Sequence, residues 1–155
     1  MKSVLLAPNK QPDWSEVFDG NKVWWVSIKM DGTRCIILNG KAYTRAGKRF
    51  PNPRVDTMLR PLLDLSSQYG YWFDMEIYDH TMEHHAQHNA VLMAHDKAIP
   101  PTMCARVFDG GSSHDWEAPC STYRDRFDRI TPIVQGCGSE QWTMVTQWHV
   151  SDLTR

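Results

Sequence analysis

The chain has 155 residues, of which 41% are apolar and 23% charged, a composition typical of one globular domain. No apolar run reaches the roughly 18 residues that a membrane-spanning helix needs, and the apolar stretch before Pro8 is too short for the core of a secretory signal. These features exclude a membrane protein and favour a cytoplasmic one. The four cysteines lack metal-binding spacing and indicate free thiols: Cys35, Cys104, Cys120 and Cys137.

The net charge of −1 hides an uneven distribution. Residues 29–60 carry eight basic and two acidic side chains, a net of +6, whereas residues 61–155 carry six basic and thirteen acidic ones, a net of −7. A basic segment of this kind favours contact with phosphates. A solvated charged loop is the plainer alternative.

Strand patterns dominate the first part of the chain. Apolar, β-branched runs predict strands at 23–29, 33–39 and 41–45. Asp31-Gly32 and Asn39-Gly40 separate them, and both dipeptides are strong hairpin signals. We therefore predict a three-stranded meander that places Lys29 and Arg45 at strand ends.

Helices and strands alternate through the rest of the sequence. The patterns predict helices at 54–67, 81–96 and 119–131, and strands at 71–78, 103–109 and 142–149. Side chains in a strand repeat every two residues, so Asp74 and Glu76 share one face. This order predicts an α+β domain built on antiparallel sheet.

The main chemical signal is the segment Lys29-Met30-Asp31-Gly32-Thr33-Arg34, a K-x-D-G-x-R pattern. A lysine beside a tight turn can be partly desolvated, and a neighbouring Arg34 also favours its neutral, nucleophilic form. The glycine would let a phosphate approach the backbone closely. An ordinary hairpin turn with solvated flanking charges is the alternative.

This segment resembles the covalent nucleotidyltransferases, a family of ATP-dependent DNA ligases and mRNA capping enzymes. Further segments resemble the ligase branch in the same order: 6–8 (LAP), 44–51 (TRAGKRFP), 73–76 (FDME), 107–109 (VFD), and Tyr123 with Arg126. The resemblance covers roughly residues 6–130. It implies the antiparallel-sheet nucleotidyltransferase fold, of which the chain would form the N-terminal portion as a single partial adenylation domain over 1–155.

The resemblance also implies roles for individual residues. Lys29 would attack ATP and hold AMP, and Glu76 would contact the ribose or a catalytic Mg²⁺ ion. Phe108 would stack on adenine. The remaining candidates are Ile28, Arg34 and Arg45 for the nucleotide, and Arg45, Lys48 and Arg49 for nicked double-stranded DNA.

The chain departs from the family pattern in several places. Ser27 stands where many ligases have Glu, and Met75 replaces a glycine. After Val145 nothing matches the family's later E-G and K-x-K segments or its OB-fold domain. The expected function is DNA ligation through lysyl-AMP. The alternatives are a truncated, non-catalytic module that binds nucleotide, DNA or a protein, and an RNA ligase or capping guanylyltransferase.

Histidines crowd the predicted helix at 81–96. His84 and His88 are four residues apart and so share a helix face. The order of these residues lacks the H-E-x-x-H pattern of zinc enzymes. A solvated polar face is therefore favoured over a metal site.

Overall fold

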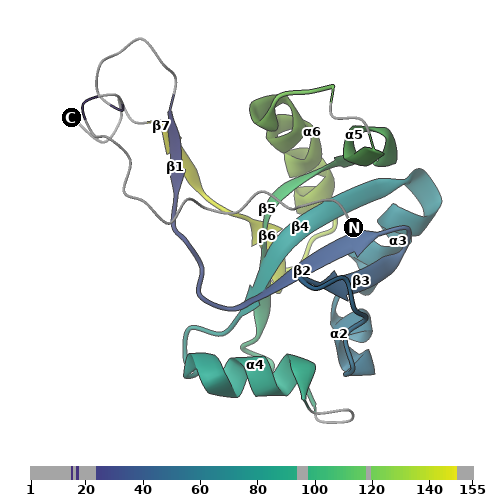
Figure 1. Cartoon of the computed structure of the whole chain (residues 1–155), viewed down its shortest axis with the longest axis vertical. Coiled ribbons are helices and arrows are strands. Elements are labelled where there is room, and N and C mark those ends of the chain that lie inside the picture. The colour runs from purple at the N-terminus through teal and green to yellow at the C-terminus, as the bar shows by residue number, and fades with distance from the viewer. Residues whose placement is uncertain (1–14, 16, 18–23, 94–97, 118–119, 150–155) are drawn as a thin grey trace. The chain divides into compact units, whose positions relative to one another are not determined.

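The computed structural model of the chain describes residues 15, 17, 24–93, 98–117 and 120–149. The chain divides into two compact units, one formed by Met1–Lys29 together with Val145–Arg155 and the other by Met30–Met144. Figure 1 shows the elements of both units. No described helix has the length and apolar character that crossing a bilayer requires.

The described part of the first unit forms a two-stranded antiparallel sheet. Strand β1 (Trp25–Ser27) pairs with β7 (Gln147–His149). The Trp25 and His149 rings meet edge to face, with their centroids 5.3 Å apart. The predicted hairpin across Asp31-Gly32 is therefore wrong, because β1 takes its partner from the end of the described chain.

The described part of the second unit contains a five-stranded sheet in the order β3-β2-β4-β5-β6. Neighbouring strands are antiparallel except for β5 and β6, which are parallel. The strands are β2 (Thr33–Leu38), β3 (Lys41–Thr44), β4 (Tyr71–Tyr78), β5 (Cys104–Ser112) and β6 (Trp142–Met144). The predicted hairpin at Asn39-Gly40 is confirmed. Both turn residues have positive φ, 50° and 68°, as a tight two-residue connection requires.

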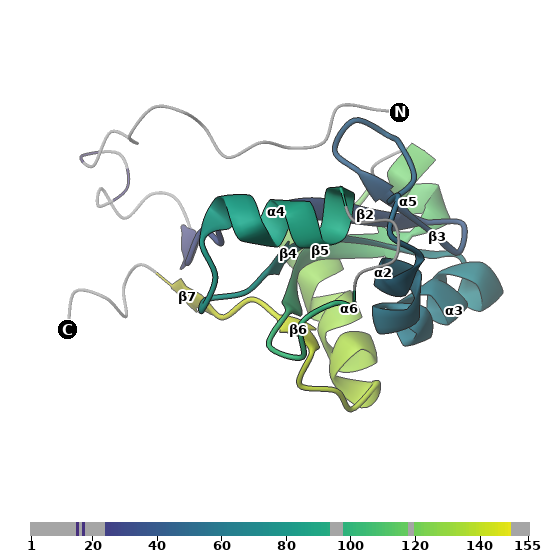
Figure 2. The same ribbon diagram turned by 90° about the horizontal axis from the view of Figure 1, so that it is seen from below.

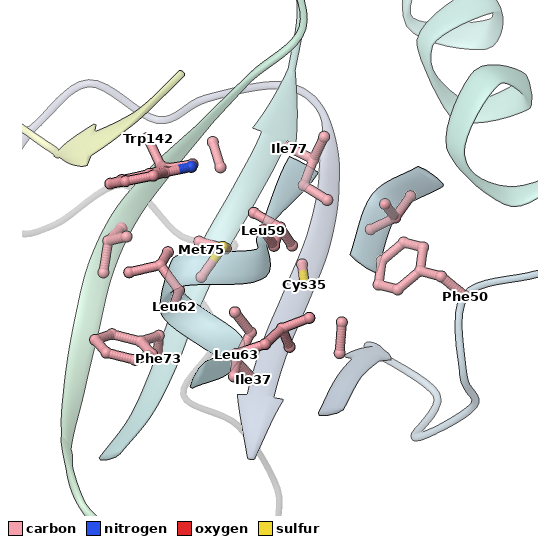
Figure 3. Close-up of a cluster of buried hydrophobic side chains, with 14 of the residues drawn as sticks. Cys35, Ile37, Phe50, Leu59, Leu62, Leu63, Phe73, Met75, Ile77 and Trp142 are labelled. Atoms are coloured by element: carbon pink, nitrogen blue, oxygen red, sulfur yellow. The ribbon is translucent and has the colours of Figure 1, made fainter. Parts of the chain in front are cut away.

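The helices of the second unit are α2 (Pro53–Met58), α3 (Arg60–Tyr69), α4 (His84–Leu92), α5 (Ser113–Glu117) and α6 (Tyr123–Gly136). Helices α2, α3 and α6 cover one face of this sheet (Figure 2). Their apolar side chains pack on alternate strand residues, and Figure 3 shows part of the resulting core: Cys35, Ile37, Leu59, Leu62, Leu63, Phe73, Met75 and Ile77.

Several predicted elements differ in extent from those observed, and three of the differences have a clear physical reason. The helix expected at 54–67 is two helices, because Pro61 has no N–H to continue the ladder of α2. Helix α6 starts at Tyr123, after a capping box of Thr122 and Asp125, and runs to Gly136. The strand expected at 142–149 is two strands, β6 and β7, in different sheets.

Candidate nucleotide-binding face of the sheet

The face of the sheet opposite the apolar core carries charged side chains at its centre. In β2, Arg34 alternates with the core residue Cys35, and in β4, Glu76 alternates with Met75 and Ile77. The register aligns Arg34 of β2, Glu76 of β4 and Arg106 of β5 across three adjacent strands. We call Arg34, Asp74, Glu76, Arg106 and Phe108 the charged face.

Arg34 and Asp74 form a forked ion pair on this face. Arg34 Nε donates to Asp74 Oδ1 at 2.8 Å, and Arg34 Nη2 contacts Asp74 Oδ2. The Asp74 side chain is only 3% exposed, and this burial raises its pKa while Arg34 opposes the rise. Desolvation dominates here because the charged form loses water on burial. Arg34 is thus oriented by a carboxylate before any ligand binds.

Phe108 lies directly beneath this ion pair. The guanidinium carbon of Arg34 sits 4.9 Å from the centroid of the Phe108 ring, within the range of a cation–π contact. The register of β4 and β5 shifts here, since Asp74 pairs with Asp109 and Met75 pairs with Val107. Phe108 is therefore the extra residue of a β-bulge.

Glu76 is linked to the segment that enters β2. The backbone N–H of Gly32 donates to Glu76 Oε1 at 3.3 Å. A Cβ on Gly32 would lie 2.2 Å from the carbonyl oxygen of Ile77. The glycine is therefore needed where the chain passes close to β4. The structure shows a close approach of β4 to this glycine, and the approach of a phosphate expected from the sequence stays a prediction.

Two candidate residues lie in the first unit. Ile28 and Lys29 follow β1 and directly precede the second unit. Both are exposed, Ile28 to 62%. Burial therefore does not provide the desolvation of Lys29 that the sequence predicted. Only three residues separate Lys29 from Thr33, the first residue of β2.

The basic candidates Arg45, Lys48 and Arg49 lie at the turn that follows β3. The Gly47 N–H donates to the Thr44 carbonyl at 2.8 Å, and the Thr44 N–H donates to the Lys48 carbonyl at 2.8 Å. All three basic residues are exposed. Arg49 pairs with Asp56, and its guanidinium carbon lies 5.7 Å from the Tyr43 ring centroid. The turn places Arg45 and Lys48 near its tip.

The helix rich in histidines lies beside the segment that leads into β2. The rings of His84 and His88 stack with centroids 6.1 Å apart, so the predicted shared face is confirmed. His84 Nε2 lies 3.7 Å from Asp31 Oδ1, and His88 Nδ1 lies 3.4 Å from Thr33 Oγ1. Among the described residues no group of three or more side chains could hold a metal ion. His95 falls outside them.

Tyr123 and Arg126, which follow the 107–109 segment in the sequence, both form hydrogen bonds with residues of that segment in β5. The Tyr123 hydroxyl donates to the Phe108 carbonyl at 2.6 Å. Arg126 forms a bidentate ion pair with Asp109, in which Nε donates to Oδ1 at 3.0 Å and Nη2 donates to Oδ2 at 2.7 Å. Arg106 is a charged-face residue that sequence reasoning missed. The alternation of the strand from Arg106 to Phe108 was the signal that could have found it.

Comparison with known proteins identifies the fold. No known family pattern and no curated protein matches the sequence. Among solved structures, the Chlorella virus DNA ligase-adenylate matches 96% of this chain and 50% of its own, with a TM-score of 0.64 and 18% identity. The bacteriophage T7 ATP-dependent DNA ligase, in complex with ATP, matches 90% of this chain and 54% of its own, with a TM-score of 0.56 and 16% identity.

A third structure, Pmar-Lig_PreS3, matches 81% of this chain and 31% of its own, with a TM-score of 0.64 and 16% identity. The chain thus spans between about a third and about half of the length of these proteins. These likenesses confirm the predicted fold class. The chain has the mixed α+β nucleotidyltransferase fold found in the adenylation domains of ATP-dependent DNA ligases.

Proposed function

We propose that this chain is the adenylating part of an ATP-dependent DNA ligase, in which Lys29 accepts AMP from ATP. One observation carries the proposal: Arg34, Glu76 and Phe108 come from three separate segments of the sequence, and the sheet brings them onto one face. The nucleotidyltransferase fold supports the same conclusion, because solved structures with that fold include a DNA ligase in complex with ATP.

The proposed chemistry begins with nucleophilic attack. The neutral amine of Lys29 attacks the α-phosphorus of ATP, forms a P–N bond and loses a proton, while the bond to the β-phosphate breaks and pyrophosphate leaves. AMP then passes to the 5′-phosphate of a nick. Attack by the 3′-hydroxyl seals the strand and releases AMP.

On the charged face, Phe108 would stack on the adenine, and Arg34 would contact the ribose or a phosphate. Phosphoryl transfer depends mainly on positioning and on neutralising charge. Ile28, which precedes the lysine, would line the nucleotide.

Glu76 is the candidate ligand for Mg²⁺. A single carboxylate fits this ion, because Mg²⁺ usually keeps several waters and takes one or two carboxylates together with substrate phosphates. Glu76 is half-buried and oriented by the Gly32 N–H. The ion would supply charge neutralisation at the phosphates.

Nicked duplex DNA is the proposed substrate, and the turn after β3 is the proposed contact. Arg45, Lys48 and Arg49 are exposed there, and Arg45 would also reach the nucleotide or the 5′-phosphate at the nick. Clustered arginine and lysine side chains bind the DNA backbone through its phosphates.

Incubation with α-labelled ATP and Mg²⁺, followed by a denaturing gel, tests the covalent step. We expect an acid-labile label on the wild-type chain and none on Lys29→Ala. Lys41→Ala is the matched control, because Lys41 is an exposed lysine on β3, and it should label like the wild type. A label that persists in Lys29→Ala would contradict the proposal.

The preferred nucleotide and the preferred nucleic acid separate a DNA ligase from a capping guanylyltransferase and an RNA ligase. Label from GTP instead of ATP would favour a capping guanylyltransferase, and sealing of nicked RNA in preference to nicked DNA would favour an RNA ligase. A second candidate is binding without catalysis, because the sheet groups Arg34, Glu76 and Phe108 on one face whether or not Lys29 reacts. Saturable ATP or DNA binding by a folded chain that takes no label would favour it.

A further inference from the structure

The bulge in β5 creates a problem of backbone geometry at Phe108. The residues on either side of it, Val107 and Asp109, pair in register with β4, and Phe108 has no partner residue there. An extra residue of this kind leaves its peptide groups outside the ladder, and unpaired peptide groups are costly when water is excluded. Something other than β4 must therefore fix the position of Phe108.

Tyr123, the first residue of α6, supplies a hydrogen bond to the Phe108 carbonyl. Its hydroxyl donates to that oxygen at 2.6 Å, a normal length for a strong O–H···O bond. The hydroxyl belongs to a half-buried side chain.

Arg126 fixes Asp109, the residue that follows Phe108. Its guanidinium grips both carboxylate oxygens of Asp109, and its Nη1 donates to the Ser121 carbonyl at 3.0 Å. Both side chains are only 10% exposed. A forked arginine–carboxylate pair restrains direction as well as distance. Two residues that are three apart in α6 thus hold Phe108 and Asp109, the residue that follows it.

The helix that carries these two residues is itself anchored. Thr122 and Asp125 form a capping box at the start of α6, which fixes the first turn of the helix. Asp109 also pairs in register with Asp74, which orients Arg34 over the Phe108 ring. One arginine–carboxylate pair therefore contacts the ring, and a second one holds the residue that follows it.

We propose that Tyr123 and Arg126 are positioning residues that hold the bulge so that the Phe108 ring meets the nucleotide base. The inference rests on the proposed function, because it takes Phe108 as the base-stacking residue. Base–aromatic stacking depends on ring placement. Loss of the Tyr123 hydroxyl should therefore weaken ATP binding and leave the chemical step unchanged at saturating ATP.

The test uses 4-fluorophenylalanine placed only at position 108 of the full chain and observed by ¹⁹F NMR. The variants are Tyr123→Phe, which removes one hydroxyl, and Arg126→Lys, which keeps the charge but loses the fork. Tyr69→Phe and Arg124→Lys are the matched controls, since Tyr69 is 67% exposed and Arg124 pairs with Asp128 on the surface of α6.

We expect Tyr123→Phe and Arg126→Lys to shift and broaden the resonance at position 108, and the controls to leave it unchanged. ATP titration should show a dissociation constant raised about fivefold or more, within what base–aromatic stacking contributes. The labelling rate at saturating ATP should stay within about twofold of the unsubstituted chain, because hydrogen bonds that place a ring affect binding before chemistry.

The outcomes separate this inference from the proposed function. If ATP moves the resonance of the unsubstituted chain but Tyr123→Phe and Arg126→Lys match it in spectrum and in ATP affinity, the inference is wrong and nucleotide binding stands. If the two variants move the resonance but ATP never does, Tyr123 and Arg126 place the ring, but the ring does not meet a base and the proposed function is wrong. Arg126→Lys variants that fail to fold leave Tyr123→Phe as the deciding case.

Discussion

Gly32 is a residue for which the sequence pattern and the structure give different reasons for a glycine. The glycine belongs to the K-x-D-G-x-R segment, where a close phosphate contact was expected. Its Cα faces β4 so closely that an added Cβ would meet the Ile77 carbonyl oxygen at 2.2 Å and Tyr78 Cβ at 2.7 Å. The residue is therefore required by strand packing whether or not a nucleotide binds.

We predict that Gly32→Ala destabilises the chain by about 1–3 kcal/mol, the usual cost of overpacking. Gly136→Ala is the matched control, because no atom lies within 4 Å of the added Cβ. A helical alanine there should be neutral or stabilising by up to about 1 kcal/mol. Urea unfolding of both variants measures the difference, and equal midpoints would show that β4 does not restrict this position.

Asp115 links two elements, α5 and the start of α6. Its carboxylate accepts hydrogen bonds from Ser121 Oγ at 2.8 Å, from Ser112 Oγ at 2.9 Å and from Arg129 Nη1 at 3.0 Å. The Ser121 hydrogen bond is the largest of the effects that hold the pKa of Asp115 well below its ordinary value. Its side chain is only 2% exposed, so protein groups supply most of its hydrogen bonds.

We predict that Asp115→Asn lowers the free energy of unfolding by about 2 kcal/mol at pH 7, as expected for a hydrogen-bonded charged group. A lowered pKa in the folded state stabilises the protein above the unfolded pKa, and this contribution is lost as the pH falls. The gap between wild type and variant should therefore narrow from pH 5 towards pH 3.

Denaturant unfolding at several pH values checks this trend. Asp128→Asn serves as the control, because Asp128 is 54% exposed in its pair with Arg124 and such pairs contribute less than about 1 kcal/mol. A gap for Asp115→Asn that does not depend on pH would contradict the role of its charge.

The elements that the sequence predicted well are those with strong local patterns. The strand at 71–78 matches β4, and the Asn39-Gly40 turn joins β2 to β3. Both depend on signals within a few residues: apolar alternation in one case and two residues able to adopt positive φ in the other.

The elements that the sequence misjudged depend on distant partners. Asp31-Gly32 has the composition of a hairpin turn, yet β1 pairs with β7, which lies more than a hundred residues further along the chain. Local composition cannot reveal which strand supplies the hydrogen bonds. The division of 142–149 into β6 and β7 has the same origin, because β6 pairs with a strand of one sheet and β7 pairs with a strand of the other.

The candidate site shows the same limit. Resemblance to a family indicated Arg34, Glu76 and Phe108, but not that Arg34 would already grip Asp74 or that Arg106 would share their face. These facts follow from strand register, which is set by pairing across the whole sheet.

At the scale of the whole molecule, the second unit has its own sheet and core. The buried cluster draws all of its members from within Met30–Met144. We predict that a chain of residues 30–144 unfolds in one cooperative transition, as single domains of this size usually do. Circular dichroism during thermal unfolding, compared with the full chain, measures this. A broad, non-cooperative transition would show that the second unit needs the first.

The uneven charge along the chain leads to a second prediction at this scale. Binding of nicked duplex DNA should weaken steeply as salt rises, because neutralised phosphates release counterions. Arg45→Ala and Lys48→Ala should each reduce the slope of log affinity against log salt by about 0.9. Arg124→Ala is the control, since its charge pairs with Asp128. Unchanged slopes in the two turn variants would place the DNA contact elsewhere.

The bulge in β5 bears on which residues related chains would retain. The pairs on either side of Phe108 are already in register with β4, so a deletion of that one codon would leave the sheet fully paired. Pairing alone gives no reason to retain the extra residue, and a bulge disrupts the ladder locally. On the proposed function, chains that bind nucleotide through this residue should keep it, and chains that do not bind nucleotide could lose it without loss of strand pairing. The length of β5 in related chains would therefore test whether this face binds nucleotide.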